Sequence, residues 1–327
     1  MKRIAIIGAG IAGLTLAREI HRLARVTLFE KSRGFGGRMA TRQAKPYQFD
    51  HGAQFFTAKS EPFASFLKPY IASGHVARWD AEFVEIESDN IICRRNWKDG
   101  PPHYVCAPKM NALAKQMAAD LDVVLQTRVT RIAGMKSRWR LYDENQVSLG
   151  EFDWVVLAIP ARQALDLMPE SFADLGIIAA KQMLGCYSLM LGFKQVLSLG
   201  WQAAFVSGAD ISWISNDSSK PGRPDCETLL VHSTNRWAEQ NLEADHDRVV
   251  AYLLAELERV IRHDVSGADH VSLQRWRYAN IARQNGADFL IDPGQKLAAV
   301  GDWCIHGRIE SAYLSGFRLA RELVPGI

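Results

Sequence analysis

The chain has 327 residues, a formal net charge of +3 and no long Lys/Arg run, a balance that argues against a nucleic-acid partner. Its five cysteines include no C-x-x-C pair and its nine histidines show no zinc-type spacing, so we expect reduced thiols and no metal site. No stretch approaches the length of a membrane span, and the apolar start lacks a signal-peptide cleavage site. We therefore expect a soluble, cytoplasmic protein of two lobes with no membrane partner, whose oligomeric state is left open.

The N-terminal residues carry the first informative motif. Residues 4–7 are apolar and predict a buried strand, which runs directly into G-x-G-x-x-G at Gly8, Gly10 and Gly13. Gly8 permits a tight turn, Gly10 lets the backbone approach a pyrophosphate, and Gly13 lets the next helix pack closely. The free N–H groups at that helix start attract phosphate oxygens. The motif therefore predicts a dinucleotide site.

The next predicted elements extend this site. Apolar residues recur at helical spacing over 11–23, and residues 26–29 predict a second strand. Glu30 ends that strand, where a carboxylate binds the ribose hydroxyls of an adenosine. The following K-S-R-G-F-G-G-R-M places three glycines beside Arg33 and Arg38. Such a flexible basic loop can fold over a pyrophosphate, with Arg38 as a bidentate donor.

Two later segments of the chain predict further parts of the same cofactor site. In Q-F-D-H-G-A-Q-F-F-T, Gly52 allows the backbone to run close to a flat ring system. Near the C-terminus, residues 296–300 predict a strand, and Asp302 follows it before a helix expected over 309–323. A strand-end Asp suits a ribityl hydroxyl, and the helix N-terminus suits a ring carbonyl.

The central part of the chain offers weaker signals. Residues 210–215 alternate in polarity and predict a strand, whereas 249–262 have the spacing of an amphipathic helix. The run K-P-G-R-P at 220–224 predicts a turn or surface loop.

These segments resemble the flavin-containing amine oxidase superfamily and, within it, the bacterial renalase-like group. The resemblance spans nearly the whole chain and rests on K-S-R-G-x-G-G-R-M, D-x-G-A-Q-x-F-T, G-H-V-A-x-W, H-x-T-x-x-W-x-x-Q-N-L, R-W-x-Y-A and G-D-W-C-x-x-G-R-x-E-x-A. It implies an α/β fold with a Rossmann-type FAD-binding lobe (1–60, 104–160 and 295–327) and a discontinuous α+β substrate lobe (61–103 and 161–294), whose sheet we expect to be mixed or antiparallel.

The resemblance implies non-covalent FAD as the cofactor. Gln54 and Phe55 would lie beside the isoalloxazine, and Val129, in a strand expected over 127–131, would read the adenine. No cysteine lies between residues 266 and 301, where relatives attach flavin, so we expect Cys304 to be a buried free thiol. The full set of implied FAD contacts is Gly8, Gly10, Ile11, Ala12, Gly13, Glu30, Lys31, Gly37, Arg38, Gly52, Ala53, Gln54, Phe55, Val129, Gly301, Asp302, Glu310 and Ala312.

The resemblance also implies an activity: oxidation of 2- or 6-dihydronicotinamide dinucleotides to NAD(P)+, with O2 as acceptor and H2O2 as product. The catalytic residues are unknown, because flavin N5 would carry the chemistry. Candidate substrate contacts are Trp213, His232, Asn235, Trp237, Arg277, Tyr278 and His306. The structural alternative is that Trp213 and His232 are core residues, that Trp237 anchors a helix start, and that several of the polar groups brace the lobe interface.

Other functions remain open on the sequence alone. The nearest is a flavin amine or polyamine oxidase, followed by a monooxygenase and by a non-catalytic FAD-binding interaction protein. A single G-x-G-x-x-G argues against a second dinucleotide module of this type.

Overall fold

The apolar run at the N-terminus forms β1 (Arg3–Ile7), which lies inside a six-stranded sheet ordered β19-β20-β13-β1-β2-β9. This computed structural model describes residues 1–135, 137–284 and 286–326. The neighbouring strands pair in parallel, except that β19 runs antiparallel to β20. The other strands of the sheet are β2 (Arg25–Phe29), β9 (Asp122–Val124), β13 (Trp154–Leu157), β19 (Leu290–Asp292) and β20 (Leu297–Ala299).

Both faces of this sheet are covered, which explains why β1 is apolar at successive positions. Ile4 and Ile6 pack with α1 (Ile11–Ile20) and α8 (Ile309–Leu323), whereas Ala5 and Ile7 face the opposite layer. That layer contains the antiparallel strands β10 (Arg131–Met135), β11 (Arg138–Tyr142) and β12 (Ser148–Phe152), together with α4 (Ala161–Leu167) and α5 (Leu175–Ala179). The predicted Rossmann-type lobe is confirmed.

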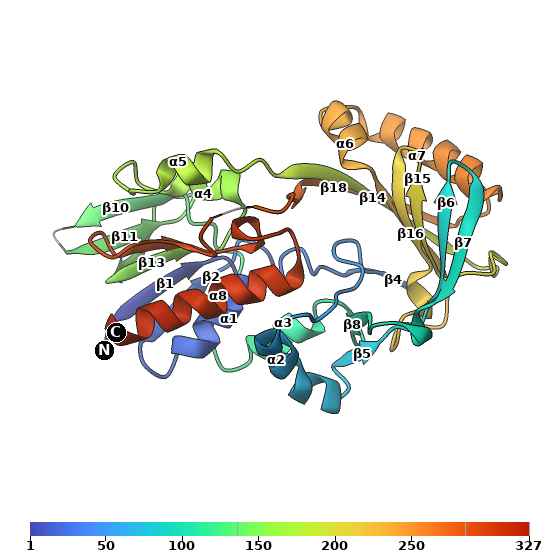
Figure 1. Ribbon diagram of the computed structural model, residues 1–327. Coiled ribbons are helices and arrows are strands. Elements are labelled where there is room, and N and C mark those ends of the chain that lie inside the picture. Colours follow the sequence, from blue (N-terminus) through green and yellow to red (C-terminus); the bar gives the residue numbers. More distant parts are fainter. Residues whose placement is uncertain (136, 285, 327) are drawn as a thin grey trace.

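Helices from the two ends of the chain lie side by side in this lobe (Figure 1). A Cβ at Gly316 of α8 would lie 2.2 Å from the backbone oxygen of Ala12 in α1, so the two helices approach as closely as glycine permits.

The second lobe is built on a seven-stranded sheet ordered β18-β14-β17-β16-β15-β6-β7. Here β6 and β15 pair in parallel and the other neighbours are antiparallel, which confirms the expectation of a mixed sheet. The strands are β6 (Glu82–Glu87), β7 (Asn90–Asn96), β14 (Leu184–Phe193), β15 (Ala203–Ser207), β16 (Ile211–Ser215), β17 (Glu227–Ser233) and β18 (His270–Asn280).

The two faces of this sheet have different roles. Helices α6 (Asn235–Asn241) and α7 (His246–Ile261) cover the outer face, where Ile214 and Val231 join their core. The inner face turns toward the first lobe and contacts β4 (Tyr47–Phe49) through Met190 and Leu230 (Figure 1). Trp213 and His232 alternate with Ile214 and Val231, and therefore belong to the inner face.

Smaller elements connect the lobes. They are β3 (Arg42–Ala44), α2 (Glu61–Ala72), β5 (Val76–Arg78), β8 (Tyr104–Cys106) and α3 (Ala112–Met117), with 3₁₀ turns at Trp97–Asp99, Asp217–Ser219, Asp302–Cys304 and Val324–Gly326.

Several element predictions can be compared with the structure. The helix expected over 309–323 has those bounds, and the one expected over 249–262 begins three residues earlier because Asp245 caps it, accepting bonds from the N–H groups of Asp247 and Arg248. The strand expected over 127–131 is wrong. Gln126 adopts a φ of +53°, which interrupts the extended chain, and β10 begins at Arg131.

The predicted lobe boundaries stay a prediction. Strand β19 belongs to the six-stranded sheet although it precedes the boundary predicted at residue 295.

Candidate functional site

The glycine motif after β1 leaves space at one of its three positions. A Cβ at Gly8, whose φ is +107°, would lie 2.5 Å from the Ala158 oxygen, and one at Gly13 would lie 2.2 Å from the Gly8 oxygen. Both positions therefore need glycine for packing alone. At Gly10, in contrast, the Cβ position has no atom of the described chain within 4 Å apart from its chain neighbours. The open space lies at the start of α1, where the sequence predicts a pyrophosphate.

Segments far apart in the sequence meet around this space. The Glu30 carboxylate accepts a hydrogen bond from the Ala9 N–H at 2.9 Å, and the Gly36 N–H donates to the Ala9 oxygen at 2.9 Å. The Arg38 guanidinium forms an ion pair with Asp302, in which Nη1 lies 2.8 Å from Oδ2. The basic loop and the C-terminal G-D segment, predicted separately, thus come together in space.

The loop after β4 connects this region to the second lobe. The Ala53 N–H donates to the Arg38 oxygen at 2.9 Å, so the loop lies directly against the basic segment. On its other side, the His51 oxygen accepts bonds from Ser188 Oγ at 2.7 Å and from Trp276 Nε1 at 2.8 Å. Because Ser188 lies on β14 and Trp276 on β18, the loop is fastened to the sheet of the second lobe.

Aromatic side chains form a continuous surface next to this loop. The Phe55 ring centroid lies 4.9 Å from Trp97, 5.1 Å from His103 and 5.4 Å from Trp213. Trp97 and His103 stack with their centroids 3.8 Å apart. Phe55 and Trp213 were predicted as site residues, and the structure brings them together. Trp97 and His103 were missed, because they lie some forty residues from the motif that contains Phe55 and carry no motif of their own.

Unpartnered polar atoms mark the same region. Among the described residues, no hydrogen-bond partner is found for Nε2 of His232, Nε1 of Trp213, or Nδ1 of His51 and His306, although all four atoms are buried. Burial, followed by the charge of Lys220, lowers the pKa of His232 to about 4. Burial, followed by Arg42, lowers the pKa of His51 to about 4 as well. Both imidazoles are therefore neutral at pH 7 and available to a polar ligand.

These two histidines make stability depend on pH. Between about pH 6.5 and pH 4 these two histidines are protonated in the unfolded chain but not in the folded chain. The free energy of unfolding therefore has its full value above pH 6.5 and decreases as the pH is lowered toward 4. We expect up to about 3 kcal/mol of loss per histidine. Urea unfolding measured at several pH values in this range gives the free energy of unfolding as a function of pH, and this free energy should fall less steeply with falling pH in His232→Leu than in the wild type. The matched control is His246→Leu, on an exposed histidine of α7, which should keep the wild-type slope; equal slopes for all three proteins would contradict the assignment.

Three predicted substrate residues lie away from this region. Asn235 Nδ2 donates to the Gly185 oxygen at 2.6 Å, and Trp237 stacks on Tyr252 of α7 with centroids 5.0 Å apart. Arg277 pairs with exposed Glu243, Nη2 lying 3.0 Å from Oε2. The structure does not bring these three to the inner face; they brace the outer layer, whereas the structural alternative had placed such polar groups at the lobe interface.

Tyr278 and His306 lie nearer the predicted flavin segments. The oxygen of Ala279, next to Tyr278, accepts a bond from Arg38 Nη1 at 3.1 Å. Tyr278 also lines a cavity of about 400 Å³ together with Arg162 and Lys181. His306 follows the 3₁₀ turn that contains Asp302.

The remaining predicted cofactor residues have the following environments. Val129 is buried, and its segment reaches Glu30 through a bond from the Thr127 N–H to the Glu30 oxygen at 2.9 Å. Lys31 Nζ donates to Gln163 Oε1 at 3.3 Å. The other positions are held by backbone packing or hydrogen bonds: Gly37 beside Gly10, the Gly301 N–H on Ser315 Oγ, the Glu310 carboxylate on the N–H groups of Lys59 and Ser60, and Ile11, Ala12 and Ala312 in the first turns of α1 and α8.

The run at 220–224 forms a turn, as predicted, with Gly222 and Pro224 exposed, but two of its side chains are buried. The side chains of Lys220 and Arg223 are 0% and 1% exposed, and they pair with Asp217 and Asp50, which are equally buried. Burial alone would raise the pKa of Asp50, but the Lys220 and Arg223 charges outweigh it and hold that pKa low; burial raises the pKa of Asp217. The Pro and Gly residues of this run are typical of exposed turns, so composition concealed the ionic cluster.

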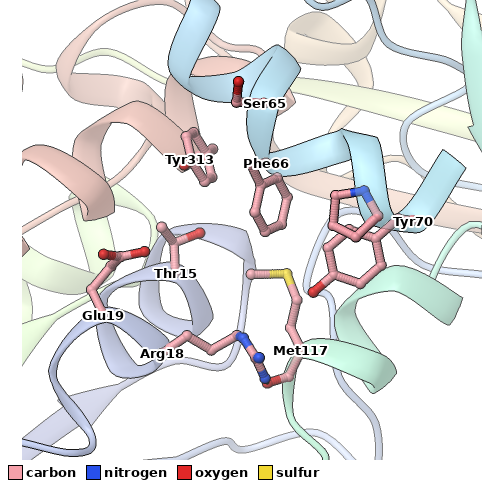
Figure 2. A pocket seen from close by; sticks show the side chains of 9 residues that line it. Thr15, Arg18, Glu19, Ser65, Phe66, Tyr70, Met117 and Tyr313 are labelled. Carbon is pink, nitrogen blue, oxygen red and sulfur yellow. The ribbon is translucent and has the colours of Figure 1, made fainter. Parts of the chain in front are cut away.

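A separate groove lies on the helical side of the first lobe. It has a volume of about 260 Å³ between α1, α2, α3 and α8, and its lining includes Arg18, Phe66, Tyr70 and Tyr313 (Figure 2). None of the predicted site residues lines it. In the described parts of the chain, no group of His, Cys, Asp or Glu side chains could hold a metal ion, and no helix is both long and apolar enough to cross a membrane.

These residues fit a flavin dinucleotide. The open position at Gly10, flanked by glycines that packing requires, is the space that a pyrophosphate needs. Glu30 lies beside it to meet a ribose. The Arg38–Asp302 pair and the aromatic surface around Phe55 then lead toward the second lobe.

Comparisons with known proteins agree with this geometry. A family model described as NAD(P)-binding Rossmann-like domain matches residues 6–70, and one described as flavin containing amine oxidoreductase matches residues 75–324. Similar solved structures include a proposed protoporphyrinogen oxidase from Exiguobacterium sp. 255-15, with 13% identity and a TM-score of 0.81 over 100% of this chain and 99% of that one.

Two further structures share the fold at a lower TM-score. A wild-type putrescine oxidase bound to putrescine shares 11% identity, with a TM-score of 0.74 over 99% of both chains. Cyclohexylamine oxidase from Brevibacterium oxydans IH-35A shares 14% identity at the same TM-score and coverage. At these identities the structures show a common fold. The second family match, in contrast, spans well over half of the residues, so the chain belongs to the flavin-containing amine oxidoreductase family, and FAD is its cofactor.

Proposed function

We propose that the protein is an FAD-dependent oxidase of 2- or 6-dihydronicotinamide dinucleotides. The reaction consumes the dihydro substrate, O2 and one proton, and yields NAD(P)+ and H2O2. The observation that carries the proposal is the set of neutral, unpartnered polar atoms on the inner face, Nε2 of His232 and Nε1 of Trp213. A neutral polar ligand group such as a carboxamide could form hydrogen bonds with both atoms. Without such bonds, each buried atom destabilises the folded protein, because it has lost its hydrogen bonds to water.

The proposed chemistry asks little of the side chains. FAD, when bound, supplies the hydride acceptor and the route to oxygen. The lone pair of the dihydropyridine nitrogen drives hydride departure, so no general base is needed. The chain's own work would be to hold the substrate ring flat against the cofactor and to exclude water, and the cluster of Phe55, Trp97 and Trp213 supplies apolar aromatic rings for this.

Charges near His306 also favour an anionic substrate. Its pKa is lowered by burial and then by Arg308 and Arg283, is raised in part by Asp302, and is lowered slightly further by Lys59, so positive charges outnumber negative ones around it. This basic surrounding suits the pyrophosphate of a dinucleotide and opposes entry of a protonated amine.

The buried lysine is not placed for amine oxidation. That reaction starts from a neutral amine, and members of the amine oxidase superfamily use a lysine with a bound water near flavin N5. Lys220 Nζ is instead held by Asp217 Oδ1 at 2.5 Å and Gln54 Oε1 at 3.1 Å. Two of its three donors thus bond to the protein, and the Asp50 carboxylate lies 3.7 Å from the ammonium group.

We further propose that FAD is bound non-covalently. Cys304 is buried, and burial raises the pKa of its thiol to about 12, so the nucleophilic thiolate is suppressed at neutral pH. Acid precipitation of the holoprotein should release all of the flavin into the supernatant, and yellow colour retained in the pellet would contradict this.

The substrate assignment predicts selective bleaching of the flavin. Borohydride reduction of NAD+ gives a mixture that contains the C2 and C6 isomers. When this mixture is rapidly mixed with holoprotein without oxygen, the visible flavin band should bleach. Pure C4-reduced NADH, putrescine and cyclohexylamine are the controls and should leave the band unchanged. On admitting air, the isomers should give NAD+ and H2O2 in equal amounts. Bleaching by an amine and not by the isomers would overturn the proposal in favour of an amine oxidase.

A further inference from the structure

Four ionic side chains form a closed cluster between the two lobes. Asp50 comes from the loop after β4, and Asp217, Lys220 and Arg223 come from the segment after β16. Lys220 Nζ lies 2.5 Å from Asp217 Oδ1 and 3.7 Å from Asp50 Oδ2, and Arg223 pairs with Asp50. All four side chains are at most 1% exposed.

The cluster fixes one further side chain, Gln54. Gln54 Oε1 accepts bonds from Lys220 Nζ at 3.1 Å and Ser215 Oγ at 2.8 Å. Gln54 Nε2 donates to the oxygens of Asp50 at 2.5 Å and Gly52 at 3.0 Å. All four hydrogen-bonding positions of the amide are therefore used, and its orientation is determined, because only Oε1 can face the ammonium group.

The same contacts hold the surrounding backbone. Asp217 Oδ2 accepts the Asp50 N–H at 2.6 Å, and Arg223 Nη1 donates to the Cys106 oxygen at 2.5 Å. Asp50 Oδ1 also accepts the Met110 N–H at 3.1 Å. The cluster thus ties the loop carrying Gln54 and Phe55 to the second lobe and to the start of α3.

Stability alone does not account for such an arrangement. Burying charged groups costs several kcal/mol per ion, and well-packed apolar side chains of similar volume are often as stabilising. An apolar cluster could fill the space, but it could not orient an amide or select one position of the loop.

We propose that Lys220 is a positioning residue that sets the geometry of the flavin site by orienting Gln54 and thereby the Gly52–Phe55 loop. The inference rests on the proposed placement of the isoalloxazine beside this loop. It goes beyond the substrate assignment, because it concerns any reaction that uses the ring.

The test compares Lys220→Met with the double variant Lys220→Met/Asp217→Asn. The single variant leaves a buried carboxylate without its cation and should lower the melting temperature strongly. The double variant removes both charges and leaves the Asp50–Arg223 pair intact, so its melting temperature should recover. If Lys220 positions the loop, the double variant should still show an altered visible circular dichroism band of bound FAD and a shifted flavin reduction potential. Its rate constant for flavin reduction should fall by about 10²-fold, the effect expected from a displacement near 1 Å.

Two further variants complete the experiment. Ser215→Ala removes one bond to Gln54 Oε1 and the 3.2 Å contact of Ser215 Oγ with Asp217 Oδ1, but it leaves all four charges in place, and should change the circular dichroism band in the same direction. Arg140→Met, at a half-buried pair with Glu151 on the three-stranded sheet and away from the cluster, is the control and should match the wild type in spectrum and potential. Wild-type spectra and potentials in both the double variant and Ser215→Ala would overturn the proposal and leave the cluster a structural feature. Spectrum and potential need no substrate, so this result stays distinct from a failure of dihydronicotinamides to bleach the flavin.

Discussion

Gly316→Ala is expected to lower the free energy of unfolding by about 3 kcal/mol or more. The added methyl group would lie 2.2 Å from the Ala12 backbone oxygen, and neither helix can move away without opening the core shared by α1, α8 and β1. Urea unfolding followed by far-ultraviolet circular dichroism measures the change.

The control for this variant is Gly176→Ala in α5. No atom of the described chain lies within 4 Å of the Cβ position of Gly176, so alanine there should stabilise the protein by about 0.5–1 kcal/mol through its better helix propensity. Equal stability of the Gly316 and Gly176 variants would show that the two terminal helices do not pack as described.

Gly10→Ala should separate cofactor binding from folding. The backbone at Gly10 has φ −79° and ψ 178°, which alanine adopts without strain, and the Cβ position is open. The apo protein should therefore keep its stability. The methyl group would, however, occupy the space predicted for the pyrophosphate, and overpacking of about 1–3 kcal/mol corresponds to roughly a tenfold to hundredfold loss of FAD affinity.

Titration of apo protein with FAD, followed by quenching of flavin fluorescence, measures this affinity. Gly267→Ala, at an open position in the second lobe, is the control and should bind FAD as the wild type does. Undiminished affinity in Gly10→Ala would place the cofactor elsewhere, whereas loss of apo stability would mean that this glycine serves packing.

Residues whose contacts lie close to them in the sequence were predicted best. Gly13 and Glu30 contact neighbours within one strand–helix–strand unit, so local spacing was enough to single them out, whereas Gly8 packs against Ala158, far along the chain. The C-terminal Asp302 was also predicted, because a strand end followed by a helix start is visible in the sequence.

Tertiary packing decided the residues that were predicted less well. Trp237 sits in a recognisable motif and Trp213 only in a segment of alternating polarity, yet that alternation along β16 directs Trp213 to the inner face, whereas α6 places Trp237 beneath α7. Lys220 lies in a run with the composition of an exposed turn, and its burial depends on Asp50, which is 170 residues away in sequence. No local pattern encodes such a contact, so turn chemistry predicted the turn but not the burial of its charged side chains.

The contact between α1 and α8 has a consequence for biosynthesis. The N-terminal unit begins the nucleotide site, but its apolar face is covered by a helix at residues 309–323 (Figure 1). During translation, β1 and α1 leave the ribosome long before the helix that shields them has been made. The first lobe therefore reaches its native packing only after residues 309–323 have left the ribosome. Asp302 is made equally late, so the apolar face of the N-terminal unit stays exposed while the residues between them are synthesised.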